Sequence, residues 1–79
     1  MGTVSLDQAT QIKSRHEREW LELPGVTGVD VGHRIVDNRP TDEFVIRVYV
    51  ENLGKAPSLP GAVEGVPVVV IERRFMLHS

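Results

Sequence analysis

Three histidines, His16, His33 and His78, are the side chains of this chain best suited to metal binding or proton transfer, since it contains no cysteine. Their spacing matches no metal-binding motif. A hydrolase triad could be assembled from a serine, a histidine and Asp30, but the Gly-x-Ser-x-Gly pattern of a nucleophile elbow is missing from the sequence. We therefore expect no catalytic residue, no metal site and no cofactor, and we expect that the protein is not an enzyme.

Two further groups of residues have a spacing that invites a chemical role. The adjacent carboxylates Asp42 and Glu43 could bind a cation, but at the start of a strand such a pair more often caps a turn or protects an edge. The glycines Gly25, Gly28 and Gly32 do not form a dinucleotide-binding fingerprint, because no strand precedes them. We expect them instead at a turn, at a bulge and at a point of close backbone approach.

Length and composition limit the possible classes of protein. The chain has 79 residues, of which 41% are hydrophobic, and this is enough for one folded domain spanning residues 1–79. A net charge of −2 argues against a nucleic-acid partner. No apolar run approaches the roughly 20 residues of a membrane span, and the N-terminus lacks the layout of a signal peptide. We expect a cytoplasmic protein that binds neither nucleic acid nor membranes.

The first element that must position these side chains is an amphipathic helix over residues 5–22. Its apolar stripe recurs at steps of three and four residues and comprises Leu6, Ala9, Ile12, His16 and Trp20. Ser5 and Gln8 fit a capping box at the start, and Pro24 followed by Gly25 ends the helix. On this stripe His16 is more simply interpreted as a partly buried packing residue than as a ligand.

Strands follow the helix. Residues 26–36 and 42–51 alternate in polarity around a polar turn at residues 37–41, which predicts a β-hairpin. After a connection at residues 52–60, residues 66–72 form an apolar third strand, and residues 73–79 form a tail. A repeated phrase, LPGVTGVDV and LPGAVEGVPVVV, opens the first and last of these strands. The expected fold class is α+β, with the helix packed on a three-stranded sheet in an incomplete ferredoxin-like plait.

The two faces of this sheet are expected to differ. One face should pack under the helix and Trp20, and it comprises Val29, Val31, His33, Ile35, Phe44, Ile46 and Val48. With one helix available, the other face has little to cover it. We expect a protein interface there, and its candidate residues are Arg34, Val45, Arg47, Tyr49, Val69, Ile71 and Arg73. The partner is another protein or a second copy in a homodimer; the alternative is a solvated face with charges paired across strands.

Three segments together resemble a known family, and they read GVTGVDVGHRI, TDEFVIRVYVE and GVPVVVIE. They are similar to the small N-terminal domain that precedes trypsin-like serine protease domains in many bacterial proteins and in plant proteases of the narrow-leaf type. The resemblance covers residues 15–72 and implies an accessory or regulatory domain. Because the chain carries no protease domain, the resemblance transfers no catalytic residue.

The sequence leaves three functions open. The first is a non-catalytic interaction or accessory domain that acts through the uncovered sheet face or through a sheet edge. The second is a propeptide-like chaperone or inhibitor of a serine protease, in which Arg73 and Arg74 would mark a processing point. The third is a regulatory domain that binds a small ligand, an expectation that rests on the plait layout alone.

Overall fold

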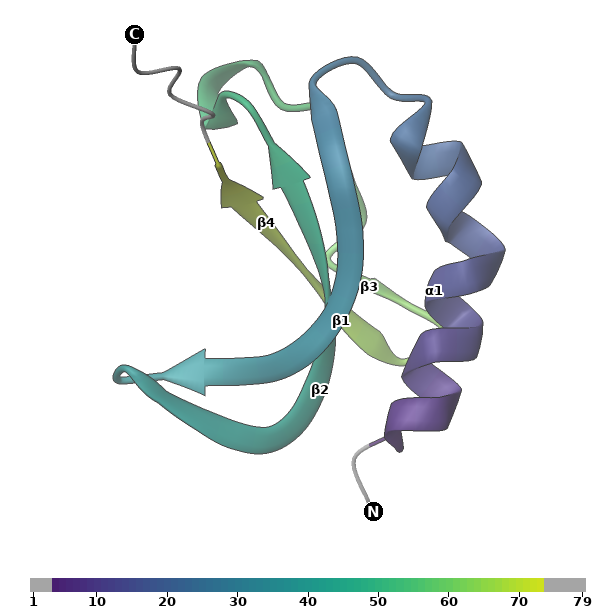
Figure 1. Ribbon diagram of the computed structural model, residues 1–79, viewed down its shortest axis with the longest axis vertical. Coiled ribbons are helices and arrows are strands. Elements are labelled where there is room, and N and C mark those ends of the chain that lie inside the picture. The colour runs from purple at the N-terminus through teal and green to yellow at the C-terminus, as the bar shows by residue number, and fades with distance from the viewer. Residues whose placement is uncertain (1–3, 74–79) are drawn as a thin grey trace, which may run out of the picture.

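The computed structural model describes residues 4–73, and in these residues one helix packs on a mixed four-stranded sheet (Figure 1). In chain order the elements are α1 (Leu6–Leu21), β1 (Val26–Val36), β2 (Arg39–Val50), the short 3-10 helix η1 (Leu53–Lys55), β3 (Ala62–Val63) and β4 (Val66–Glu72). The α+β class is therefore confirmed. The incomplete ferredoxin-like plait is not confirmed.

The predicted capping signals set both ends of α1. Ser5 is the N-cap, its side chain accepts a hydrogen bond from the amide of Gln8, and the Gln8 side chain accepts one from the amide of Ser5. At the other end Glu22 is the C-cap and Gly25 adopts a φ of +84°, a left-handed conformation that favours glycine. Capping thus fixes the point at which the chain leaves the helix and enters β1.

The sheet has the strand order β1-β2-β4-β3, so the expected number of three strands was wrong. β1 and β2 form the predicted antiparallel hairpin, β4 pairs with β2 in parallel, and β3 pairs with the start of β4. β3 is only two residues long, and a tight turn at Glu64 and Gly65, both with positive φ, joins it to β4. A two-residue strand has no alternation from which a sequence pattern could identify it.

The hairpin turn is tighter than expected, because β2 begins at Arg39 and not at residue 42. Asp37 and Asn38 alone form the turn, with φ of 53° and 64°, the conformation of a two-residue type I′ connection. Pro40 then lies within β2 opposite Ile35. The proline is tolerated because the described pairing of β4 with β2 starts only at Ile46, which leaves Pro40 with one strand neighbour.

The core lies between α1 and one face of the sheet. Its buried residues are Ala9, Ile12, Trp20, Ile46, Val48, Val50 and Val66. Val29, Val31 and Phe44 pack against this cluster as expected. α1 is 16 residues long, and no helix in residues 4–73 has both the length and the apolar character needed to cross a membrane.

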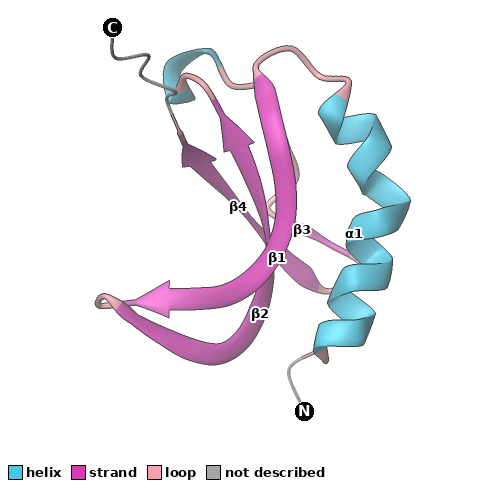
Figure 2. Cartoon of the chain, viewed as in Figure 1, coloured by secondary structure: helices cyan, strands magenta, loops and turns pink. Residues whose placement is uncertain are grey.

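The expectation that Ile35 and His33 pack under the helix was wrong. Ile35 is 59% exposed, and His33 is exposed although its ring lies 4.6 Å from that of Phe44. Near this point three residues of β2 lie opposite the single residue Arg34 of β1. The irregular register accompanies a bend that carries the end of the hairpin away from α1, as Figure 2 shows. The helix therefore does not reach these two side chains.

Candidate functional site

The sheet face that points away from α1 carries side chains from three adjacent strands. Alternation places Gly28, Asp30 and Gly32 of β1 beside Tyr49, Arg47 and Val45 of β2, in that order. Parallel pairing then places Val69 beside Arg47 and Ile71 beside Tyr49. We call this set the open face. The open face thus carries a group of polar side chains next to a group of aliphatic side chains.

A polar cluster of three residues occupies the β1 side of the open face. Arg47 donates two hydrogen bonds to Asp30, from Nε to Oδ1 at 2.7 Å and from Nη2 to Oδ2 at 2.8 Å. The Tyr49 hydroxyl donates a third to Oδ2 at 3.1 Å. These bonds give the Asp30 carboxylate two partners on the neighbouring strand, so its charge is matched within the sheet.

The contacts of this cluster shift the pKa of two of its members. Burial, and then the hydrogen bond to Asp30, raises the pKa of the Tyr49 hydroxyl above its ordinary value. Hydrogen bonding to Asp30 likewise raises the pKa of the Arg47 guanidinium. Tyr49 is therefore a neutral hydrogen-bond donor near pH 7, and Arg47 is a fixed cation.

One glycine of β1, Gly32, gives the cluster its space. A Cβ atom on Gly32 would lie 2.7 Å from Nη1 and 2.8 Å from Nε of Arg47, so the guanidinium occupies the place of a side chain at that position. At Gly28 a Cβ atom would lie 3.6 Å from the ring of Tyr49, an ordinary contact. The approach at Gly32 is therefore made by the side chain of Arg47 and not by backbone as expected, whereas a register shift between Val26 and Gly28 agrees with the expected bulge.

The arginine at the end of β4 extends the polar cluster. The guanidinium carbon of Arg73 lies 4.8 Å from the centre of the Tyr49 ring, and that of Arg47 lies 5.9 Å from it. Both distances are within the range of a cation–π contact. Two cations thus lie near the ring of Tyr49, and its hydroxyl is bound to Asp30.

A cavity of about 300 Å³ opens on the same face, where the hairpin bends over the sheet. It is lined by His33, Arg34, Ile35, Val45, Arg47, Val69 and Ile71. Val45 lies at its floor with only 2% of its surface exposed, although it does not belong to the core under α1. Arg34 donates a hydrogen bond from Nη1 to Glu43 at 3.0 Å at the rim. The volume is at the lower end of the range for ligand pockets.

The structure therefore brings five of the seven predicted interface residues together around one cavity. These are Arg34, Val45, Arg47, Val69 and Ile71. Tyr49 and Arg73 lie on the same face but outside the cavity lining. Sequence reasoning missed His33 and Ile35 as lining residues, because the bend that brings them there follows from a register irregularity that leaves no pattern in either strand.

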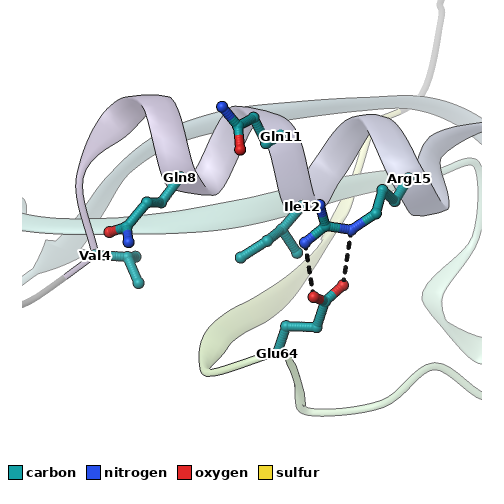
Figure 3. Close-up of a pocket in the computed structure, with 6 residues that line it drawn as sticks. All are labelled: Val4, Gln8, Gln11, Ile12, Arg15 and Glu64. Atoms are coloured by element: carbon teal, nitrogen blue, oxygen red, sulfur yellow. Dashed lines mark hydrogen bonds and ion pairs between the residues drawn. The ribbon is translucent and has the colours of Figure 1, made fainter.

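A second polar cluster joins α1 to the turn between β3 and β4. Glu64 accepts two hydrogen bonds from Arg15, at 3.2 Å from Nε and 2.6 Å from Nη2 (Figure 3). Its Oε2 also lies 3.0 Å from Nε2 of His16. Arg15 first, and then His16, lowers the pKa of the Glu64 carboxyl. His16 also stacks on Trp20, with ring centres 5.4 Å apart. This cluster attaches the β3–β4 turn to the helix.

The groove beside this cluster is a weaker candidate for binding than the cavity on the open face. It measures about 210 Å³ and is lined by Val4, Gln8, Gln11, Ile12, Arg15 and Glu64. Figure 3 shows that Arg15 and Glu64 point toward each other across its end, so each meets the charge of the other. Within residues 4–73, no three His, Asp or Glu side chains are grouped so that they could hold a metal ion.

Comparisons with protein-family models, with curated proteins and with solved structures gave no match to this chain. The case for a function therefore rests on the geometry of the open face.

Proposed function

We propose that this chain is a non-catalytic protein-interaction domain and that the open face is its contact surface. One observation carries the proposal: the side chains of Val45, Val69 and Ile71 surround a cavity on the face opposite α1, and no helix in residues 4–73 covers that face. Aliphatic side chains gathered around a hollow on an exposed sheet face are typical of interaction sites.

The residue types at the edge of the cavity also favour a protein partner. Arginine and tyrosine are enriched at protein interfaces because both combine a broad apolar or planar surface with directed hydrogen bonds. Arg47 and Tyr49 are held in place by Asp30, so little conformational entropy is lost when a partner contacts them. The alternative of a purely solvated face accounts for the charge pairing but not for the aliphatic cavity beside it.

The test is affinity capture with matched variants. Val69→Thr with Ile71→Thr removes apolar surface from the cavity while keeping β-branched side chains in β4, and the control Val36→Thr with Leu53→Thr changes residues that are 48% and 52% exposed elsewhere. We expect that wild type and control capture a protein that the V69T/I71T variant does not capture, and a cooperative melting transition in each variant shows that both are folded. Identical sets of captured proteins from all three would refute the proposal.

The other functions expected from the sequence have less support. The propeptide-like role needs Arg73 and Arg74, but Arg74 lies outside the described residues, as do His78 and the rest of the expected tail at residues 74–79. The ligand-binding regulatory role rests on the ferredoxin-like layout, which stays a prediction. The resemblance to domains that precede serine proteases and the cytoplasmic location also stay part of the proposal. The resemblance is tested by whether a trypsin-like protease is the captured partner, and the location by where the tagged chain is found after cell fractionation.

A further inference from the structure

We propose that the cavity on the open face is an anchor site for an acidic–aliphatic peptide segment, in which one aliphatic side chain enters the cavity and a neighbouring carboxylate binds the arginines at its rim. The inference deepens the proposed function and rests on it. It concerns the chemistry of the partner, which the aliphatic surface alone does not define.

The lining of the cavity combines only two kinds of side chain. Four residues are aliphatic, Ile35, Val45, Val69 and Ile71, and the other three are basic, His33, Arg34 and Arg47. No acidic residue lines the cavity in the described chain, although the whole chain has a net charge of −2. Glu43 and Asp30 each bind one of the arginines from outside the lining, so the side chains that face the cavity itself are aliphatic and basic. Such a lining is complementary to an apolar group that carries a negative charge.

The basic groups keep donors for a ligand after their internal bonds are counted. Arg47 uses Nε and Nη2 on Asp30, which leaves Nη1 for a further acceptor. Arg34 meets Glu43 through Nη1 alone, and 45% of its side chain is exposed. Two guanidinium groups with spare N–H donors on one cavity form a site suited to a carboxylate.

The third basic residue is oriented by the hairpin itself. Nδ1 of His33 lies 2.8 Å from the carbonyl oxygen of Thr41, so Nδ1 donates that hydrogen bond. Nε2 is the nitrogen left for a ligand, as an acceptor in the neutral ring and as a donor in the protonated ring. His33 thus adds a polar contact beside the two arginines without competing with them for Asp30 or Glu43.

The size and position of the cavity favour a peptide over a free small molecule. At about 300 Å³ it is at the lower limit for ligand pockets, and Ile35 on its wall is 59% exposed, so a free ligand would remain partly in water. Tyr49 is paired with the lining residue Ile71 on the neighbouring strand, so it offers contact area beside the cavity to the chain that flanks an anchoring side chain. A segment of a partner protein uses both features.

The test measures fluorescence polarisation of labelled peptides with the full chain. The probe is GSLEVEGS; GSLKVKGS reverses the charge and GSSESEGS removes the aliphatic side chains. We expect the probe to bind more tightly than either control, and we expect added sodium chloride to weaken binding through screening. Equal binding of the charge-reversed or the polar peptide would overturn the inference.

Two variants locate the site. Arg34→Gln with Glu43→Gln removes the ion pair at the rim without changing the net charge, and it should weaken binding about fivefold to tenfold because one charge-assisted contact is lost. Arg18→Gln is the control, since Arg18 is 93% exposed on α1. Equal affinity for wild type and R34Q/E43Q, or an equal loss in R18Q, would overturn the inference.

Two other occupants of the cavity are outcomes of the same experiments. Binding of hexanoate at the cavity without binding of GSLEVEGS would show that the ligand is a free carboxylate. A concentration-dependent mass that R34Q/E43Q abolishes would show that a second copy occupies the site. Either result overturns the peptide assignment. A captured partner that is lost with V69T/I71T, together with failure of GSLEVEGS to bind, would overturn this inference and leave the proposed function standing.

Discussion

The two isoleucines of the hairpin give the sharpest test of the fold, because the sequence assigns both to the core and the structure separates them. Ile46 is fully buried at 0% exposure, whereas Ile35 is 59% exposed. Substituting each with valine removes the same single methylene group and keeps a β-branched side chain suited to a strand. Any difference between the two variants therefore reports the surroundings of that methylene group.

The expected magnitudes follow from burial. Complete burial of a methylene group is worth about 0.8 kcal/mol, and buried Ile→Val changes cost about 0.5–1.5 kcal/mol once the cavity is included. Ile46→Val should therefore lower the free energy of unfolding by about 1 kcal/mol. Ile35→Val should lower it by about 0.3 kcal/mol, since less than half of that side chain is buried.

The assay is urea denaturation followed by the fluorescence of Trp20, which is 4% exposed and is the one tryptophan of the chain. With a slope of about 1 kcal/mol per molar urea for a domain of this size, Ile46→Val should move the midpoint down by about 1 M. Ile35→Val should move it by about 0.3 M. The slope itself should not change, because both variants unfold the same surface.

Equal losses for the two variants would refute the reasoning. That result would mean that the end of the hairpin is packed in solution and that the bend away from α1 does not exist as described. Absence of any loss in Ile46→Val would contradict the position of the core between α1 and β2. A loss in Ile46→Val that is about three times the loss in Ile35→Val supports a hairpin end that extends past the helix.

Three further predictions test the polar clusters and the turns. Tyr49 is the one tyrosine of the chain, so an alkaline absorbance titration should show a pKa above 10.0, and Asp30→Asn should lower this pKa. Because the pKa of Tyr49 is higher in the folded than in the unfolded protein, stability should fall as the pH rises from 10.0 through the raised pKa. Gly65→Ala should lower the melting temperature, at a cost of about 1–2 kcal/mol, because Gly65 has a φ of +84°, whereas Gly61→Ala should not lower it, since the φ of Gly61 is not positive. The pKa of Glu64 is lowered from 4.5, so Glu64→Gln should be less stable than wild type at pH 7, and urea midpoints of the two proteins should converge as the pH falls below 4.5 and through the lowered value.

Much of the open face could be predicted from alternation alone. Val45, Arg47 and Tyr49 alternate with Ile46, Val48 and Val50, so identifying one face as the core also identifies the other. Because side chains alternate between the two faces of a strand, an error in the predicted ends of the strand does not change which residues share a face. This is why the predicted interface residues share one face although β2 begins earlier than expected.

The missing parts of the prediction depend on pairing between distant segments. Nothing in the composition of Ala62–Val63 distinguishes a two-residue strand from a loop, since its hydrogen bonds come from β4. The partner of Asp30 is likewise set by the register between β1 and β2, which a single bulge near Gly28 shifts by one residue. The spacing of residues within one strand does not predict how that strand is aligned with its neighbour.

The sequence by itself determined the local features of this protein: the capped helix, the two alternating strands of the hairpin, the apolar β4 and the absence of cysteine chemistry. These depend on hydrogen bonds and side-chain contacts between residues a few positions apart. Tertiary structure alone decided that Arg47 lies across Gly32 to reach Asp30, and that the hairpin bends so that Ile35 and His33 join the cavity. Those features follow from strand register and bend, which depend on many weak contacts between segments far apart in the chain.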